Sequence, residues 1–268
     1  MAIENLITND TKVLELKDKK VSLSTLSRKT HVRKPVLRTW DTWYLHDKDW
    51  YFFKAFNGSD DITTKFRFVN ELIGEELSNI MELDTIHYEI ARINNHLGLA
   101  SKAFTDKKNR YYFIQDLNIP ADCMNLRNFE RLREICKTDE EYETVKNEIL
   151  KLFAIDIYMN QTDRKFKNLQ IKKEQRKLHL APVYDYEKSF QNPEEQIYKS
   201  CFARIDLSTK IDEEIPNLKD NLDTLFDLDI NDVLETIEDD KKIIIPDNLK
   251  EHYKSFVKTR RNIIKRLD

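Results

Sequence analysis

Three residues in the second half of the chain, Asp163, Asn168 and Asp185, have types and spacing suited to chemistry on phosphate. A loop aspartate can accept a proton from a hydroxyl group. Asparagine and aspartate oxygens are hard ligands that suit Mg²⁺. Transfer of phosphate from ATP mainly requires an oriented nucleophile and neutralised phosphate charge. The three residues therefore predict Mg²⁺-dependent phosphoryl transfer.

An Asp and an Asn five positions apart arise readily by chance, so this spacing is informative only together with the order of the surrounding elements. Helical periodicity over residues 139–160 precedes a polar loop at 161–168. Two short β-like runs, 169–172 and 177–180, follow it and are joined by a polar turn. Kinases arrange a catalytic-loop Asp, an Asn and a second Asp in this order.

Residues 156–171 and 179–190 resemble the C-terminal signature of HipA-like kinases. Members of that family read roughly D-x-x-x-x-N/Q-x-D-R-H-x-x-N, followed by L-A-P-x-Y-D-x-x-x-S. The resemblance implies that Asp163 is the catalytic base and that Asn168 and Asp185 bind Mg²⁺. One departure is Lys165, where the family usually has His. This lysine either supplies positive charge beside the phosphates or is a solvated surface residue.

Lys54 lies in an aromatic β-like run at residues 50–56. Burying its charge is costly unless it is paired. The resemblance implies an ATP-anchoring lysine that pairs with Glu71, near the start of a helix expected over 66–81. The alternative is a lysine on an edge strand with its ammonium in water. Other candidate partners on the same helix are Glu75 and Glu76.

The rest of the nucleotide site is assigned by position. Residues 111–117 take the place of the hinge strand, so backbone groups around Gln115 and Leu117 are expected to bind adenine. The chain has only three glycines, which excludes both a GxGxxG fingerprint and a P-loop. The basic, hydroxyl-rich segment 27–34 could cover the phosphates instead, or it could be a solvated loop.

These patterns predict an α+β, bilobal protein-kinase-like fold. A small β-rich N-lobe with one main helix is expected over residues 1–117, beginning with a hairpin of strands 42–46 and 50–56. A mostly helical C-lobe is expected over 118–268. Its predicted helices cover 125–136, 139–160, 231–238 and 246–267.

Composition excludes several classes of protein. The net charge of −3 and the pI near 6.1 do not indicate nucleic-acid binding. No apolar run approaches the length that spans a bilayer, and the acidic residues near the N-terminus argue against a signal peptide. Three widely spaced cysteines suit a reducing compartment. We therefore expect a cytoplasmic protein without membrane or direct nucleic-acid partners.

The resemblance implies a kinase that transfers the γ-phosphate of ATP to Ser or Thr hydroxyls of a protein, itself included. It also implies a toxin–antitoxin role, with an antitoxin-like partner protein. The alternatives are a pseudokinase or regulatory ATP-binding module, and a kinase of a small molecule or lipid. Retention of Lys54, Asp163, Asn168 and Asp185 together argues against the pseudokinase. A metal-dependent nuclease using Asp163, Asp185 and His179 is a more distant alternative.

Overall fold

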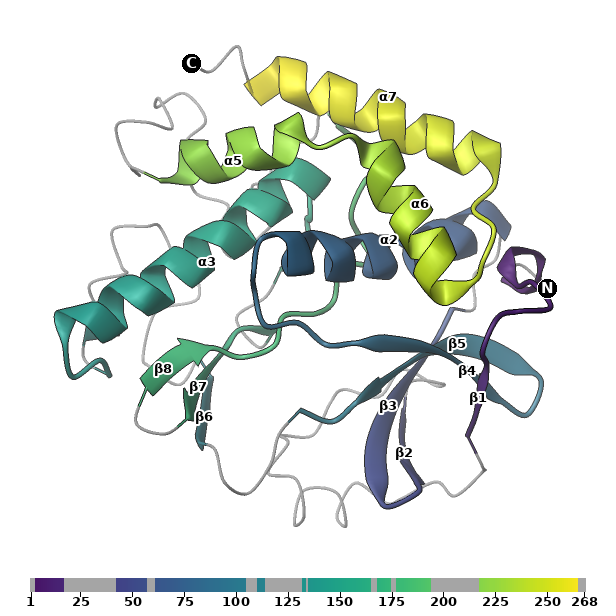
Figure 1. Cartoon of the computed structure of the whole chain (residues 1–268), viewed down its shortest axis with the longest axis horizontal. Coiled ribbons are helices and arrows are strands. Elements are labelled where there is room, and N and C mark those ends of the chain that lie inside the picture. Colours follow the sequence, from purple (N-terminus) through teal and green to yellow (C-terminus); the bar gives the residue numbers. More distant parts are fainter. Residues whose placement is uncertain are drawn as a thin grey trace.

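The computed structural model of the chain contains two β-sheets and a set of helices (Figure 1). The helices gather on one side of the molecule, and the two sheets lie apart from each other on the other side (Figure 1). The structure describes residues 3–16, 42–56, 61–104, 110–113, 132–133, 135–164, 168–174, 177–193 and 217–264. No helix within these ranges is both long enough and apolar enough to cross a membrane.

The larger sheet has five strands in the order β1-β4-β5-β3-β2. All neighbouring strands are antiparallel except β1 and β4, which are parallel. Asp47 and Lys48 have positive φ angles of 46° and 79°, which form the tight turn of the predicted β2–β3 hairpin. The strands are β1 (Leu14–Glu15), β2 (Thr42–His46), β3 (Asp49–Ala55), β4 (Tyr88–Ile93) and β5 (His96–Lys102).

Helix α2 (Asp61–Ile80) runs along this sheet and packs against helices α3 and α6 (Figure 1). Its buried apolar residues recur at helical spacing, as in Val69, Leu72 and Ile73. The helix begins five residues before the range predicted from the sequence. Glu71 consequently lies in the middle of the helix and not near its start.

The second half of the chain is built around the buried helix α3 (Asp139–Met159). The Thr138 hydroxyl caps its first turn by accepting a hydrogen bond from the Glu141 amide, and Asn160 ends it in a left-handed conformation with φ 49°. A three-stranded antiparallel sheet in the order β6-β7-β8 lies beside it. Its strands are β6 (Arg110–Phe113), β7 (Gln170–Glu174) and β8 (Lys177–Leu180).

Three further helices complete the described C-terminal part: α5 (Leu218–Asp227), α6 (Ile230–Lys241) and α7 (Asp247–Ile264). Helix α5 packs on α3, while α6 contacts both α2 and α7. The N-terminal segment joins this part, because Ile7 forms a β-bridge with Ile243. Most of the helix expected over 125–136 lies outside the described residues.

Candidate active site

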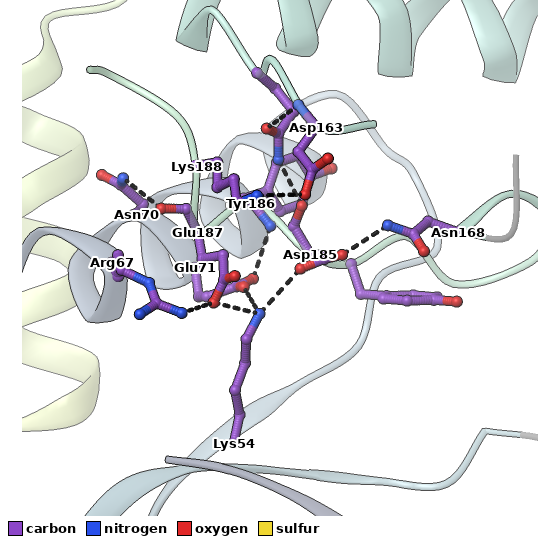
Figure 2. A network of polar contacts seen from close by, with 12 residues as sticks. Lys54, Arg67, Asn70, Glu71, Asp163, Asn168, Asp185, Tyr186, Glu187 and Lys188 are labelled. Atoms are coloured by element: carbon purple, nitrogen blue, oxygen red, sulfur yellow. Dashed lines mark hydrogen bonds and ion pairs between the residues drawn. The ribbon is translucent and has the colours of Figure 1, made fainter. Parts of the chain in front are cut away.

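Lys54, on β3, is the centre of the polar network (Figure 2). Its ammonium lies 2.5 Å from a Glu71 oxygen, 3.0 Å from an Asp185 oxygen and 3.2 Å from a Glu187 oxygen. Its side chain is only 12% exposed. Burial alone would lower the lysine pKa, but the three carboxylates outweigh it and hold the pKa well above its usual value. Lys54 is therefore a fixed cation of the site.

Glu71 is fully buried, and both of its oxygens are occupied. One oxygen accepts from Lys54, and the other accepts from the Tyr88 hydroxyl at 2.8 Å and from the Tyr186 backbone amide at 2.9 Å. These bonds tie α2 to β3, to β4 and to the residue after Asp185. Glu71 thus fixes the positions of Lys54 and of the Asp185 loop at the same time.

Asp185 lies five residues after the end of β8 and has a positive φ of 71°. One carboxylate oxygen contacts Lys54, and the other accepts from the Asn168 side-chain amide at 2.6 Å. Burial would raise the pKa of this carboxyl group, but Lys54, Arg164 and the Asn168 hydrogen bond lower it to about 2. The side chain is 31% exposed, so a charged carboxylate reaches solvent here.

Asp163 is linked to Asp185 through one side chain. The Asp163 amide donates to the Gln161 side-chain oxygen at 3.0 Å, and the Gln161 amide group donates to the Asp185 carbonyl at 2.5 Å. The Asp163 carboxylate lies 2.9 Å from the ammonium of Lys188 (Figure 2). Gln161 therefore fixes the loop that carries Asp163 relative to the loop that carries Asp185.

A buried ion pair between Arg164 and Asp156 anchors the loop that carries Asp163. Arg164 donates to both oxygens of Asp156 on α3, at 2.9 Å from Nε and 2.8 Å from Nη2, and neither side chain is exposed. The guanidinium also donates to the Tyr184 carbonyl and lies 4.7 Å from the centroid of the Tyr186 ring. Since Tyr184 and Tyr186 flank Asp185, this pair positions both of the loops that carry the site.

Glu187 is a member of the network that the sequence motifs did not indicate. It accepts from Arg67 Nη2 at 2.7 Å in addition to contacting Lys54. Burial would raise its pKa, but Lys54 and Arg67 outweigh this effect and lower it. Glu187 thus connects α2 to the segment after Asp185. No spacing rule identifies it, because the contact joins residues 120 positions apart.

Two solved structures share this arrangement of elements. The proinflammatory kinase CtkA of Helicobacter pylori matches with a TM-score of 0.58 and 14% identity, over 86% of this chain and 95% of that one. HipA of a Shewanella oneidensis MR-1 toxin–antitoxin system, solved with HipB and operator DNA, matches with a TM-score of 0.51 and 12% identity, over 97% of this chain and 72% of that one. The chain has a HipA-like kinase fold. No family model and no curated protein matches its sequence.

Within this HipA-like kinase fold, the predicted site residues Lys54, Glu71, Asp163, Asn168 and Asp185 lie in one connected network (Figure 2). Gln115 and Leu117, assigned to adenine, lie outside the described residues, as do Lys165 and segment 27–34. Of the other candidate partners for Lys54, Glu75 instead accepts from His87 at 2.7 Å. His179 contacts Glu148 on α3 at 3.0 Å, which does not favour the nuclease alternative.

The donor set of this site fits ATP with Mg²⁺. Asn168 and Asp185 offer the hard oxygen ligands that Mg²⁺ prefers, and Lys54 offers a cation for phosphate oxygens. Carboxylate oxygens of Glu71, Asp185 and Glu187 lie within 4.8 Å of one another. Glu71 and Glu187 are already bonded to Lys54, Tyr88 and Arg67. Asp185 is therefore the carboxylate of this group best suited to hold the metal.

Gly74 allows α2 to approach the Asp185 loop, so replacing it should destabilise the protein. A Cβ atom at this position would lie 2.2 Å from the buried Tyr186 ring. Alanine is the better helix former by about 1 kcal/mol, but overpacking costs about 1–3 kcal/mol. We expect Gly74→Ala to lower the free energy of unfolding, measured by urea denaturation. Asn79→Ala, at an exposed position on the same helix, is the control, and stabilisation by both changes would contradict the clash.

His87 should make stability depend on pH. Its hydrogen bond to the buried Glu75 raises the His87 pKa, although burial and the nearby Lys241 oppose the rise. A histidine whose pKa is raised by folding stabilises the protein below its unfolded pKa of about 6.5, and this stabilisation is lost as pH rises through the folded pKa. We expect the wild-type advantage over His87→Gln in urea denaturation to be larger near pH 5.5 than near pH 8. An equal difference at both pH values would refute the coupling.

Proposed function

We propose that this protein is a Mg-ATP-dependent kinase that transfers the γ-phosphate to Ser or Thr hydroxyls of a protein, including itself. The observation that supports this most directly is the Lys54–Asp185–Asn168 chain of contacts, with Asp163 joined to it through Gln161. In kinases these residue types anchor the nucleotide, hold the metal and accept the hydroxyl proton. The HipA-like fold of the chain supports the same assignment.

Each residue has a distinct role in the proposed reaction. Lys54 binds phosphate oxygens and is kept in place by Glu71. Asn168 and Asp185 would hold Mg²⁺, which neutralises phosphate charge when bound. Asp163 accepts the proton of the acceptor hydroxyl, whose oxygen forms the new bond to phosphorus as the bond to the bridging oxygen of the departing ADP breaks.

We also propose that residues 1–117 and 118–268 act as two lobes with the nucleotide between them. Lys54 and Glu71 belong to the first part, while Asp163, Asn168 and Asp185 belong to the second. Backbone groups at Gln115 and Leu117 would bind adenine between them. A cytoplasmic location remains a prediction from the sequence.

Calorimetric titration with ATP tests the nucleotide part of this proposal, and mass spectrometry tests the transfer. We expect ATP to bind tightly only when Mg²⁺ is present, and new phosphoserine or phosphothreonine to appear on the protein or on an added acceptor protein. Binding without any transfer would favour a pseudokinase. Transfer only to small molecules or lipids would favour the other enzyme class. Absence of nucleotide binding would reject all three.

A partner protein is a further part of the proposal. HipA of Shewanella oneidensis was solved with HipB and operator DNA, so we propose an antitoxin-like protein partner for this chain, with DNA contacted only through that partner. Growth arrest on expression, reversed by coexpression of the protein encoded by the neighbouring gene, is the expected result. Growth unaffected by expression would argue against a toxin role without affecting the kinase assignment.

A further inference from the structure

Lys188 occupies a position that the proposed roles above do not explain. It lies three residues after Asp185, and its ammonium is 2.9 Å from the Asp163 carboxylate (Figure 2). Both side chains are partly open to solvent, at 37% exposed for Lys188 and 26% for Asp163. Ion pairs that are open to solvent contribute little to stability. Stability therefore gives little reason for a lysine at this place.

The backbone on either side of Lys188 is held by buried groups. The Asn70 side-chain amide donates to the Glu187 carbonyl at 3.2 Å and to the Ser189 carbonyl at 2.8 Å. Asn70 is almost fully buried, and its oxygen accepts from the Tyr253 hydroxyl at 3.0 Å. Helix α2 and helix α7 together clamp the two carbonyls that flank Lys188. The backbone that carries Lys188 is thus fixed to α2 and α7, although the end of its side chain is partly exposed.

Three other cations at the site are already paired with carboxylates that hold them in place. Lys54 is engaged by three carboxylates, Arg67 by Glu187, and Arg164 by the buried Asp156. Lys188 instead faces Asp163, the proposed acceptor of the hydroxyl proton. A lysine ammonium is a compact charge with three donors, so it can contact a carboxylate and phosphate oxygens at the same time. Charge on the transferred phosphoryl group must be stabilised during transfer.

We propose that Lys188 binds the terminal phosphate of the bound nucleotide while it holds Asp163 in position for the acceptor hydroxyl. This inference rests on the proposed kinase function and adds a second phosphate-binding cation, opposite Lys54. It also assigns that task to the loop after Asp185, and not to Lys165 of the catalytic loop.

Nucleotide affinity separates a phosphate contact from a purely structural role. Calorimetry would compare Mg-ADP with the Mg complex of a non-hydrolysable ATP analogue, since the two differ in the terminal phosphate. We expect Lys188→Met to weaken binding of the triphosphate roughly tenfold, the effect of losing one charge-assisted contact, with ADP affinity changed less than about twofold. Lys188→Arg should keep most of the triphosphate preference. Lys254→Met, which removes a comparably exposed paired lysine on α7, should change neither affinity.

The transfer rate supplies a second readout. We expect Lys188→Met to lower kcat about 10- to 100-fold, in addition to raising the KM for ATP by no more than the roughly tenfold loss of triphosphate affinity. If wild type binds and transfers phosphate but Lys188→Met behaves like Lys254→Met, only the Lys188 inference is wrong. Equal weakening of both nucleotides, or loss of the triphosphate preference in Lys165→Met alone, would also overturn it. If wild type binds no nucleotide, the kinase proposal fails and this inference fails with it.

Discussion

Asp163→Asn should bind Mg-ATP about as tightly as wild type and yet transfer phosphate about 10²- to 10⁴-fold more slowly. Asparagine has nearly the same shape but cannot accept the hydroxyl proton. The hydrogen bond from residue 163 to Gln161 comes from the backbone amide, so the substitution leaves it in place. Lys54, Asn168 and Asp185, which would hold the nucleotide and metal, keep their contacts with one another.

The measurement is single-turnover transfer to an acceptor protein, paired with calorimetric titration of Mg-ATP. Asp223→Asn removes a carboxylate from the exposed face of α5 and is the matched control, with no expected effect on either quantity. Transfer at the wild-type rate by Asp163→Asn would remove Asp163 from the proposed mechanism. Loss of ATP binding together with transfer would instead assign Asp163 to nucleotide binding.

The contacts of Glu71 hold two parts of the site in fixed positions relative to each other. Glu71 holds the Lys54 ammonium with one oxygen and the Tyr186 amide with the other. Lys54 in turn contacts Asp185. Because the same buried carboxylate fixes the β3 lysine and the Asp185 loop, these two parts cannot move apart without breaking bonds to Glu71. The cost of ordering the site is therefore met largely during folding.

The sequence predicted the parts of the site that depend on local spacing. Asp163, Asn168 and Asp185 stand at short, fixed separations around a hairpin. The cost of leaving a lysine buried alone predicted a partner for Lys54, and the family resemblance identified that partner as Glu71. Contacts between distant segments have no such local signal. Glu187 with Arg67 and Asn70 with the carbonyls beside Lys188 were missed for this reason. Gln161, by contrast, has a local sequence signal, because it occupies the N/Q position of the family motif.

Element prediction shows the same division between local and distant information. The hairpin of β2 and β3 was predicted because two aromatic runs flank a polar turn, and the pairing of the two strands confirmed it. Helices α3, α6 and α7 were confirmed from their apolar periodicity. Strand β5 and helix α5 were not predicted. Strand β5 includes Gly98 and small residues that carry little β signal, and it is stabilised by pairing with β3 and β4 on either side.

Removing one member of the buried Asp156–Arg164 pair should lower the free energy of unfolding more than any other single change argued above. Asp156→Asn leaves the guanidinium in a fully buried site without its counter-charge, and breaking such a pair costs about 3–5 kcal/mol. Arg164→Met leaves the buried Asp156 carboxylate without its counter-charge in the same way, and it also removes the hydrogen bond to the Tyr184 carbonyl. Urea denaturation monitored by circular dichroism would measure both losses.

The double variant Asp156→Leu with Arg164→Met tests whether this pair serves stability or position. Replacing both charges with apolar groups avoids the desolvation penalty, so the double variant should be more stable than either single one. Its phosphate transfer should nevertheless stay low, because no guanidinium then joins α3 to the residues that flank Asp185. Glu251→Gln, in the exposed Glu251–Lys254 pair of α7, is the control and should leave the free energy of unfolding nearly unchanged. A double variant with restored stability and full transfer would show that the catalytic loops do not need this pair, and the positioning role would be wrong.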